Sequence, residues 1–170
     1  MATLELIHAG KENIPDIQAI SNIVWPVTFC EILSPKQIRY MMSMMYSTEA
    51  ITQQIEELSH HYLLVKEGDD FLGYLSYEFD YKGKGWTKIH KIYVLPDTQG
   101  KGVGRFFIGE VTKIAQAHGD TELSLNVNRF NKAIDFYKKV GFEVIGSEDI
   151  DIGNGFLMED YIMNKKISSL

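Results

Sequence analysis

A glycine-rich loop between a strand-like segment and an amphipathic helix is the feature that most constrains this chain. The loop reads Gln-Gly-Lys-Gly-Val-Gly at residues 99–104 and follows the strand-like run Ile89–Val94. Its glycines let the backbone adopt positive φ angles and turn successive amides toward one point. The first turn of the helix adds unpaired amides and about half a positive charge. The pattern therefore predicts a site for a phosphate or pyrophosphate group.

Two common phosphate-binding loops do not fit this spelling. A Walker loop needs G-x-x-x-x-G-K-[ST], and no such run occurs in the sequence. The dinucleotide-binding fingerprint needs G-x-G-x-x-G after the first strand of a βαβ unit, whereas the spacing here is G-x-G-x-G after an antiparallel meander. A glycine-rich turn without a ligand stays open as an alternative, but three alternate glycines at a helix start cost conformational entropy.

The remaining pattern predicts an α+β fold with one mixed, mostly antiparallel sheet of about seven strands flanked by helices. Helical apolar stripes dominate the first third, and short Gly-bearing turns separate β-branched runs in the middle, which favours a meander. Helices are expected at residues 13–24, from 35 onward, at 48–58, 102–118 and 132–140, and strands at 4–8, 62–66, 71–81, 87–94, 122–127, 142–145 and 157–167.

Composition bounds the class of protein. The 170 residues suit one domain, and no apolar run reaches the roughly 18 residues that a membrane-spanning helix needs. The 17 basic and 23 acidic residues give a net charge of −6, which argues against nucleic-acid binding and suits a cationic partner. The lone Cys30 and the lack of a secretory start predict a cytoplasmic protein. Cys30 and the five histidines lack metal-ligand spacing, so no metal is expected.

Further motifs surround the loop in a fixed order. Ile-Tyr-Val-x-Pro at residues 92–96 precedes it, and Asn-x-Ala-x-x-Phe-Tyr-Lys-x-x-Gly-Phe at residues 131–142 follows the next strand. With these motifs the sequence resembles the GCN5-related N-acetyltransferases (GNAT), whose phosphate loop reads [Q/R]-x-x-G-x-[G/A]. The resemblance covers residues 89–142. It implies the GNAT fold, in which acetyl-CoA lies between two splayed parallel strands, here at 89–94 and 122–127.

The same resemblance implies a cofactor site. Backbone groups of Ile92 and Val94 would pair with the pantetheine amides as an added strand does, and loop amides would hold the pyrophosphate. Asn131 stands two residues before Ala133, where the family usually has three, so Asn128 stays open as the alternative to Asn131. The implied cofactor residues are Ile92, Tyr93, Val94, Gln99, Gly100, Lys101, Gly102, Val103, Gly104, Arg105 and Asn131. For Lys101 and Arg105 a solvated surface role is the alternative.

Two residues are candidates for proton transfer. By resemblance, Tyr137 matches the donor to the leaving thiolate, although it also lies on the core face of its helix. His90 shares a strand face with Ile92 and Val94, where relatives often place a Glu base, and an imidazole has a suitable pKa. Packing or surface exposure is the alternative role of His90.

The acceptor side is expected in residues 1–60, with the cofactor core at 61–146 and C-terminal strands at 147–170. Trp25 and Phe29 would wall an amine channel, and Glu31 would hold a cation. Residues 28–46 and 158–167 loosely resemble bacterial spermine/spermidine acetyltransferases, so a small-molecule polyamine is the favoured acceptor. Protein or peptide N-acetylation and a catalytically silent CoA-binding module stay open, as does a homodimer, and neither nucleic acid nor a membrane is an expected partner.

Overall fold

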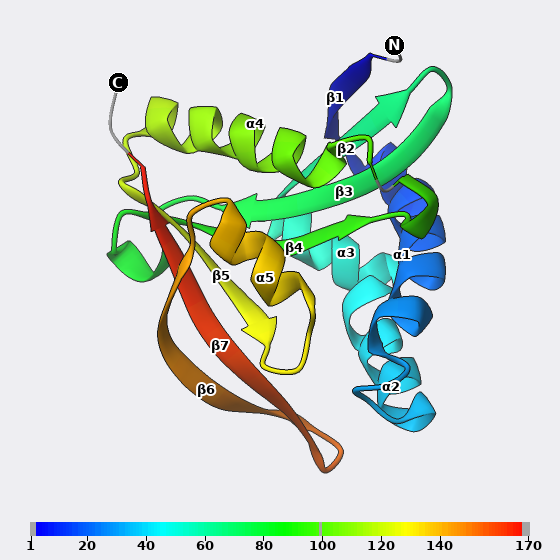
Figure 1. The fold of residues 1–170 in the computed structure, drawn as a ribbon. Coiled ribbons are helices and arrows are strands. Elements are labelled where there is room, and N and C mark those ends of the chain that lie inside the picture. The colour runs from blue at the N-terminus through cyan, green and yellow to red at the C-terminus, as the bar shows by residue number, and fades with distance from the viewer. Residues whose placement is uncertain (1–2, 99, 168–170) are drawn as a thin grey trace. The chain divides into compact units, whose positions relative to one another are not determined.

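The computed structural model describes residues 3–98 and 100–167 (Figure 1). Its strands follow the order β1-β2-β3-β4-β5-β7-β6, and β4 and β5 are parallel. The predicted α+β class with a mixed seven-stranded sheet is therefore confirmed. The strands are β1 (Leu4–Ala9), β2 (His61–Glu67), β3 (Asp70–Glu78), β4 (Trp86–Val94), β5 (Glu122–Asn128), β6 (Glu143–Gly153) and β7 (Phe156–Lys166). The helices are α1 (Ile14–Phe29), α2 (Pro35–Tyr46), α3 (Thr48–Glu56), α4 (Val103–His118) and α5 (Ala133–Lys139).

Contacts divide the chain into two compact units. The first comprises Met1–Glu78 and Lys91–Phe107, and the second comprises Phe79–His90 and Ile108–Leu170. Strand β4 and helix α4 contribute residues to both units. Among the described residues, no helix is both long enough and apolar enough to cross a membrane.

The first unit combines the antiparallel strands β1, β2 and β3 with helices α1 to α3. Serine hydroxyls start two of these helices, because Ser34 accepts from the Gln37 amide and Ser47 from the Ala50 amide, each at 3.1 Å. Helix α1 runs five residues beyond the predicted end at 24 and contains Pro26, which cannot donate a helical bond. Burial of Trp25 and Phe29, one helical turn apart, offsets that loss.

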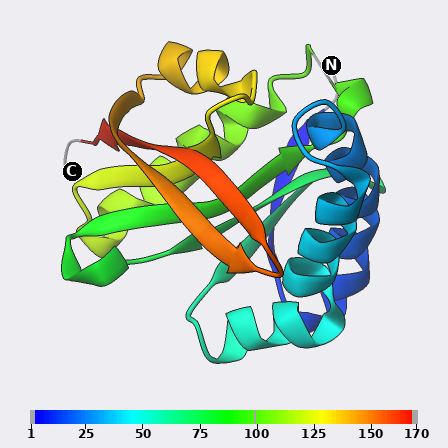
Figure 2. The same ribbon diagram turned by 90° about the horizontal axis from the view of Figure 1, so that it is seen from below.

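The second unit contains a long hairpin of β6 and β7, seen in Figures 1 and 2 beside β5. Its turn, Gly153-Asn154-Gly155, has positive φ at all three residues, which two glycines and an asparagine tolerate. The strand predicted at 142–145 is wrong in extent, because β6 continues to Gly153. Ile150 and Ile152 keep the period-two pattern, and Asp151 between them is exposed.

Candidate functional site

The glycine loop lies in the first unit and leads directly into α4. Gly100 and Gly102 have φ angles of 88° and 71°, and an added Cβ at either would meet no atom within 4 Å. Glycine is therefore required by the backbone conformation and not by crowding. The Phe106 amide bonds to the Gly102 carbonyl at 2.9 Å, so the amides of Val103, Gly104 and Arg105 belong to the open first turn. The prediction for Gln99 lies outside the described residues.

Lys101, in this loop, forms an ion pair with the end of β2. Its Nζ lies 2.7 Å from Oε1 of Glu67, and that hydrogen bond and charge raise the pKa of Lys101. Asp69, Asp70 and Asp97 line the same surface depression. The Lys101 side chain is thus directed to an acidic surface, which leaves the backbone amides as candidate anion-binding groups of this loop.

The end of β4 approaches β3 closely at Gly73. A Cβ on Gly73 would lie 2.6 Å from the Tyr93 carbonyl oxygen and 3.2 Å from Cα of Val94. The Leu95 amide also bonds to the Leu72 carbonyl at 2.8 Å. The lack of a side chain at Gly73 therefore lets the segment Ile92–Val94 lie directly against β3. The side chains of Ile92–Val94 are half-buried. Sequence reasoning missed Gly73, because a lone glycine within a strand signals close approach only weakly.

The first unit also holds a buried lysine that the sequence did not reveal. Lys91 is 8% exposed, and its Nζ donates to the Tyr62 hydroxyl and to Oε1 of Gln54, both at 2.7 Å. The ammonium lies 4.5 Å from the centre of the Tyr46 ring. Burial lowers the pKa of Lys91 to about 7. The sequence did contain one signal for this burial. Lys91 lies two residues from both Ile89 and Tyr93, so it shares their apolar face of the strand.

The predicted acceptor residues lie at the end of α1 and just after it. Trp25 is 2% exposed, its indole N–H bonds to the Tyr46 hydroxyl at 3.0 Å, and its ring lies 4.4 Å from that of Phe29. Phe29 is buried as well, whereas Glu31 is exposed in the turn that follows. The two aromatic residues are therefore part of the core of this unit.

Both candidate asparagines turn the chain of the second unit from β5 into α5. Asn128 accepts from the Phe130 amide and Asn131 from the Ala133 amide, each at 2.9 Å. Asn128 is buried, whereas Asn131 is half-buried. Tyr137, on α5, packs its ring against Phe136 and Phe142, and burial raises the pKa of its hydroxyl. That hydroxyl stays protonated near neutral pH, as a proton donor requires.

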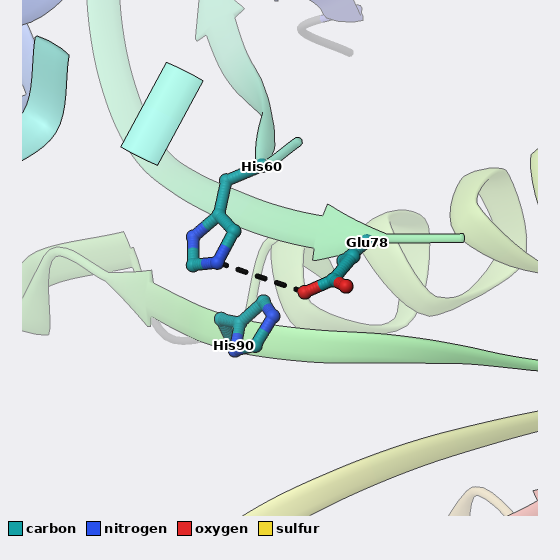
Figure 3. A group of neighbouring side chains, drawn as sticks. All are labelled: His60, Glu78 and His90. Carbon is teal, nitrogen blue, oxygen red and sulfur yellow. Dashed lines mark ion pairs between the residues drawn. The ribbon is translucent and has the colours of Figure 1, made fainter. Parts of the chain in front are cut away.

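The predicted base His90 is half-buried in the second unit, where its ring lies edge-on to Tyr81 at 5.7 Å. In the first unit, Nε2 of His60 lies 3.7 Å from Oε1 of Glu78. Figure 3 draws this ion pair together with His90. The end of β3 thus supplies a carboxylate partner for His60.

With this geometry in place, a sequence profile described as the acetyltransferase (GNAT) family matches residues 19–142. The chain therefore belongs to the GNAT acetyltransferase family. Two relatives show how its similarity is distributed. The spermidine N(1)-acetyltransferase of Thermoplasma acidophilum is 26% identical over 161 residues, covering 90% of this chain and 96% of that protein. The peptidyl-lysine N-acetyltransferase YjaB of Escherichia coli is 41% identical over 61 residues, covering 35% of this chain and 38% of that protein. Less than two fifths of the length of YjaB is thus matched.

Solved structures agree with the family fold. The PaiA N-acetyltransferase of T. acidophilum, in complex with coenzyme A, has a TM-score of 0.79 at 24% identity, covering 96% of this chain and 99% of that chain. A GCN5-related N-acetyltransferase from Rhodopseudomonas palustris has a TM-score of 0.82 at 21% identity, covering 98% of each chain. At these identities the similarity establishes the fold.

Proposed function

We propose that this protein transfers the acetyl group of acetyl-CoA to a primary amine of a small cationic molecule. The observation that carries the proposal is the loop at Gly100 and Gly102, whose positive φ angles direct the chain into the open first turn of α4. Family membership supports acetyl transfer, and the T. acidophilum fold neighbour is described in complex with coenzyme A. The spermidine acetyltransferase that aligns with 90% of this chain supports a polyamine acceptor.

In this proposal the cofactor binds along the end of β4 and the start of α4. Backbone groups of Ile92–Val94 pair with pantetheine, and the amides of Gly100–Arg105 bind the pyrophosphate. Asn131 is the further cofactor contact, with Asn128 as the alternative. Glu31 contacts the cationic acceptor, and Trp25 with Phe29 shapes the channel wall from within the core.

The reaction is direct attack of the neutral amine on the thioester carbonyl. An amine with a pKa of about 10 is neutral in only about one molecule in a thousand near pH 7, so a base is needed. His90 takes the proton that the amine loses, and an amide near Val94 stabilises the oxyanion of the tetrahedral intermediate. When the C–S bond breaks, Tyr137 donates a proton to the leaving thiolate.

A panel of acceptors tests this proposal. The purified protein is mixed with acetyl-CoA and spermidine, a lysine-containing peptide, or an aminoglycoside antibiotic, and release of the CoA thiol is followed. We expect rapid release with spermidine. Release with another class, and none with spermidine or related diamines, would overturn the polyamine acceptor.

Acetylation of protein lysines is the second candidate, because the 41% identity with YjaB covers 61 residues. Release with the peptide alone would favour it. A silent CoA-binding module is distinguished by calorimetry, since it would bind CoA and transfer acetyl to no member of the panel.

A further inference from the structure

Two acidic pairs lie across the β6–β7 hairpin, one on each face. In the register of this hairpin, Glu148 is opposite Asp160, and Asp149 is opposite Glu159. Successive residues of a strand point to opposite faces, so the two pairs do not share a face. Like charges directly opposite one another destabilise a sheet. Each pair therefore needs a cation or a hydrogen-bond donor that offsets the repulsion between its carboxylates.

One pair has its own cation. Nη2 of Arg129 lies 2.6 Å from Oδ1 of Asp149 and 3.7 Å from Oε1 of Glu159. The backbone fixes this arrangement, since the Arg129 amide donates to the Glu159 carbonyl at 2.9 Å. The Asp149–Glu159 pair thus has a cationic partner within the chain.

The other pair has an amide where the first has a guanidinium. Nδ2 of Asn126 donates to Oε1 of Glu148 at 2.7 Å and to Oδ2 of Asp160 at 3.3 Å. Lys88 donates to the Asn126 amide oxygen, so Asn126 lies between its ammonium group and the two carboxylates. Within the described residues, neither Glu148 nor Asp160 forms an ion pair.

Asp160 itself has an unused acceptor. It is 6% exposed, and its Oδ1 is buried without a hydrogen-bond partner in the part of the chain that the structure describes. Burial raises the pKa of Asp160, as does the neighbouring Glu148 charge, while the Asn126 bond and the charges of Lys88 and Arg129 act in the opposite direction. A buried carboxylate oxygen without a donor is costly, which points to a ligand that supplies the donor.

The position of the pair suits an acceptor. The parallel pairing of β4 with β5 ends at Ile89 opposite Leu125, and Asn126 is the next residue of β5. Family resemblance places acetyl-CoA where these two strands part. Glu148 is exposed, so the pair is open to solvent on one side. The carboxylates therefore lie beside the expected position of the reacting group.

We propose that Glu148 and Asp160 bind an ammonium group of the acceptor other than the one that is acetylated, so that the protein prefers amines with at least two amino groups. The inference rests on the proposed function, because it assigns the second amine of the same substrate. An ammonium group supplies donors to Oδ1 of Asp160 and to Glu148 at once. A divalent metal fits less well, since it needs about six oxygen ligands and Asn126 turns its nitrogen toward this site.

The test compares a diamine with a monoamine. KM is measured for spermidine and for butylamine in the unmodified protein and in Glu148→Gln and Asp160→Asn. The matched control is Asp149→Asn, on the opposite face of the hairpin. We expect KM for spermidine to rise about 10- to 100-fold in both variants, the usual effect of losing a charged hydrogen bond, with KM for butylamine within about twofold. Asp149→Asn should leave both values within about twofold.

Equal changes for the two amines, or no change for spermidine in Glu148→Gln, would overturn the inference. The exposed Glu148 keeps this test valid if Asp160→Asn fails to fold. Calorimetric titration of spermidine into the CoA-saturated protein separates this inference from the proposed function. If no amine releases thiol but Glu148→Gln binds spermidine about tenfold more weakly, the inference stands and the function fails. If Mg²⁺ binds and spermidine does not, the inference fails.

Discussion

Lys91 in the first compact unit and Asp160 in the second are both buried, and their surroundings differ. The Nζ of Lys91 donates two hydrogen bonds at 2.7 Å and lies over the Tyr46 ring, so residues of the same chain supply its polar partners. Asp160 has one oxygen bonded to Asn126, one oxygen with no donor among the residues that the structure describes, and Glu148 opposite it. A buried polar group whose hydrogen bonds are made within the chain needs no ligand, whereas we propose a ligand for Asp160 because one of its oxygens lacks a donor among the described residues.

The largest expected effect concerns a third buried group, the hydroxyl of Tyr137, which we assign to chemistry. Tyr137→Phe should lower kcat about 10²- to 10⁴-fold, the usual contribution of a general acid, while the melting temperature changes little. Thiol release at saturating substrates measures the effect. A natively folded variant with unchanged kcat would leave Tyr137 with packing alone and remove it from the mechanism.

The next effect tests Lys91 as a structural hydrogen-bond donor. Lys91→Ala should lower the free energy of unfolding by about 3 kcal/mol, because it leaves a cavity and removes the donor to Tyr62 and Gln54. Urea unfolding near pH 8 measures the change. Lys36→Ala, at an exposed position, is the control and should stay within about 0.5 kcal/mol of the unmodified protein. If Lys91→Ala were equally neutral, the bonded lysine would not be part of what holds this unit together.

The pH dependence of stability tests the charge state of Lys91 in the folded protein. The folded pKa of Lys91 is about 7 and the ordinary value is 10.5, so the unfolded chain binds more protons between these values. Its contribution to stability therefore rises with pH across this window, by up to about 1.4 kcal/mol per pH unit, and is flat below pH 7. Lys91→Met should remove this slope in urea unfolding at pH 7 to 10. An identical slope in the variant would show that Lys91 stays charged in the folded protein.

The smallest expected effects are changes in stability that differ in sign between the two acidic pairs. Burial raises the folded pKa of Asp160, so its contribution to stability falls as pH rises through the window above its ordinary value. Asp160→Asn should therefore raise unfolding free energy near pH 7 by about 0.2–1 kcal/mol, through relief of the repulsion from Glu148. Asp149→Asn, which removes a carboxylate paired with Arg129, should lower it by up to about 1 kcal/mol. Thermal unfolding at low salt measures both changes. Destabilisation by both variants would break the contrast between the faces.

The sequence predicted the strand, loop and helix because their signals are local. Gly100 and Gly102 have the positive φ expected of loop glycines, and α2 begins at Pro35 as predicted. Most of β6 was missed, because its acidic residues read as a loop although Ile150 and Ile152 alternate. Gly73, Lys91 and Asp160 derive their importance from residues far along the chain. Their roles could not be derived from neighbouring sequence.

Identification of the reaction product tests the proposed acetyl transfer to a polyamine most directly. The protein is incubated with acetyl-CoA and spermidine, and the products are separated and identified by mass spectrometry. We expect singly acetylated spermidine, formed in equal amount to free CoA thiol and absent without the protein. Unchanged spermidine and acetyl-CoA, in a sample that calorimetry shows to bind CoA, would contradict it.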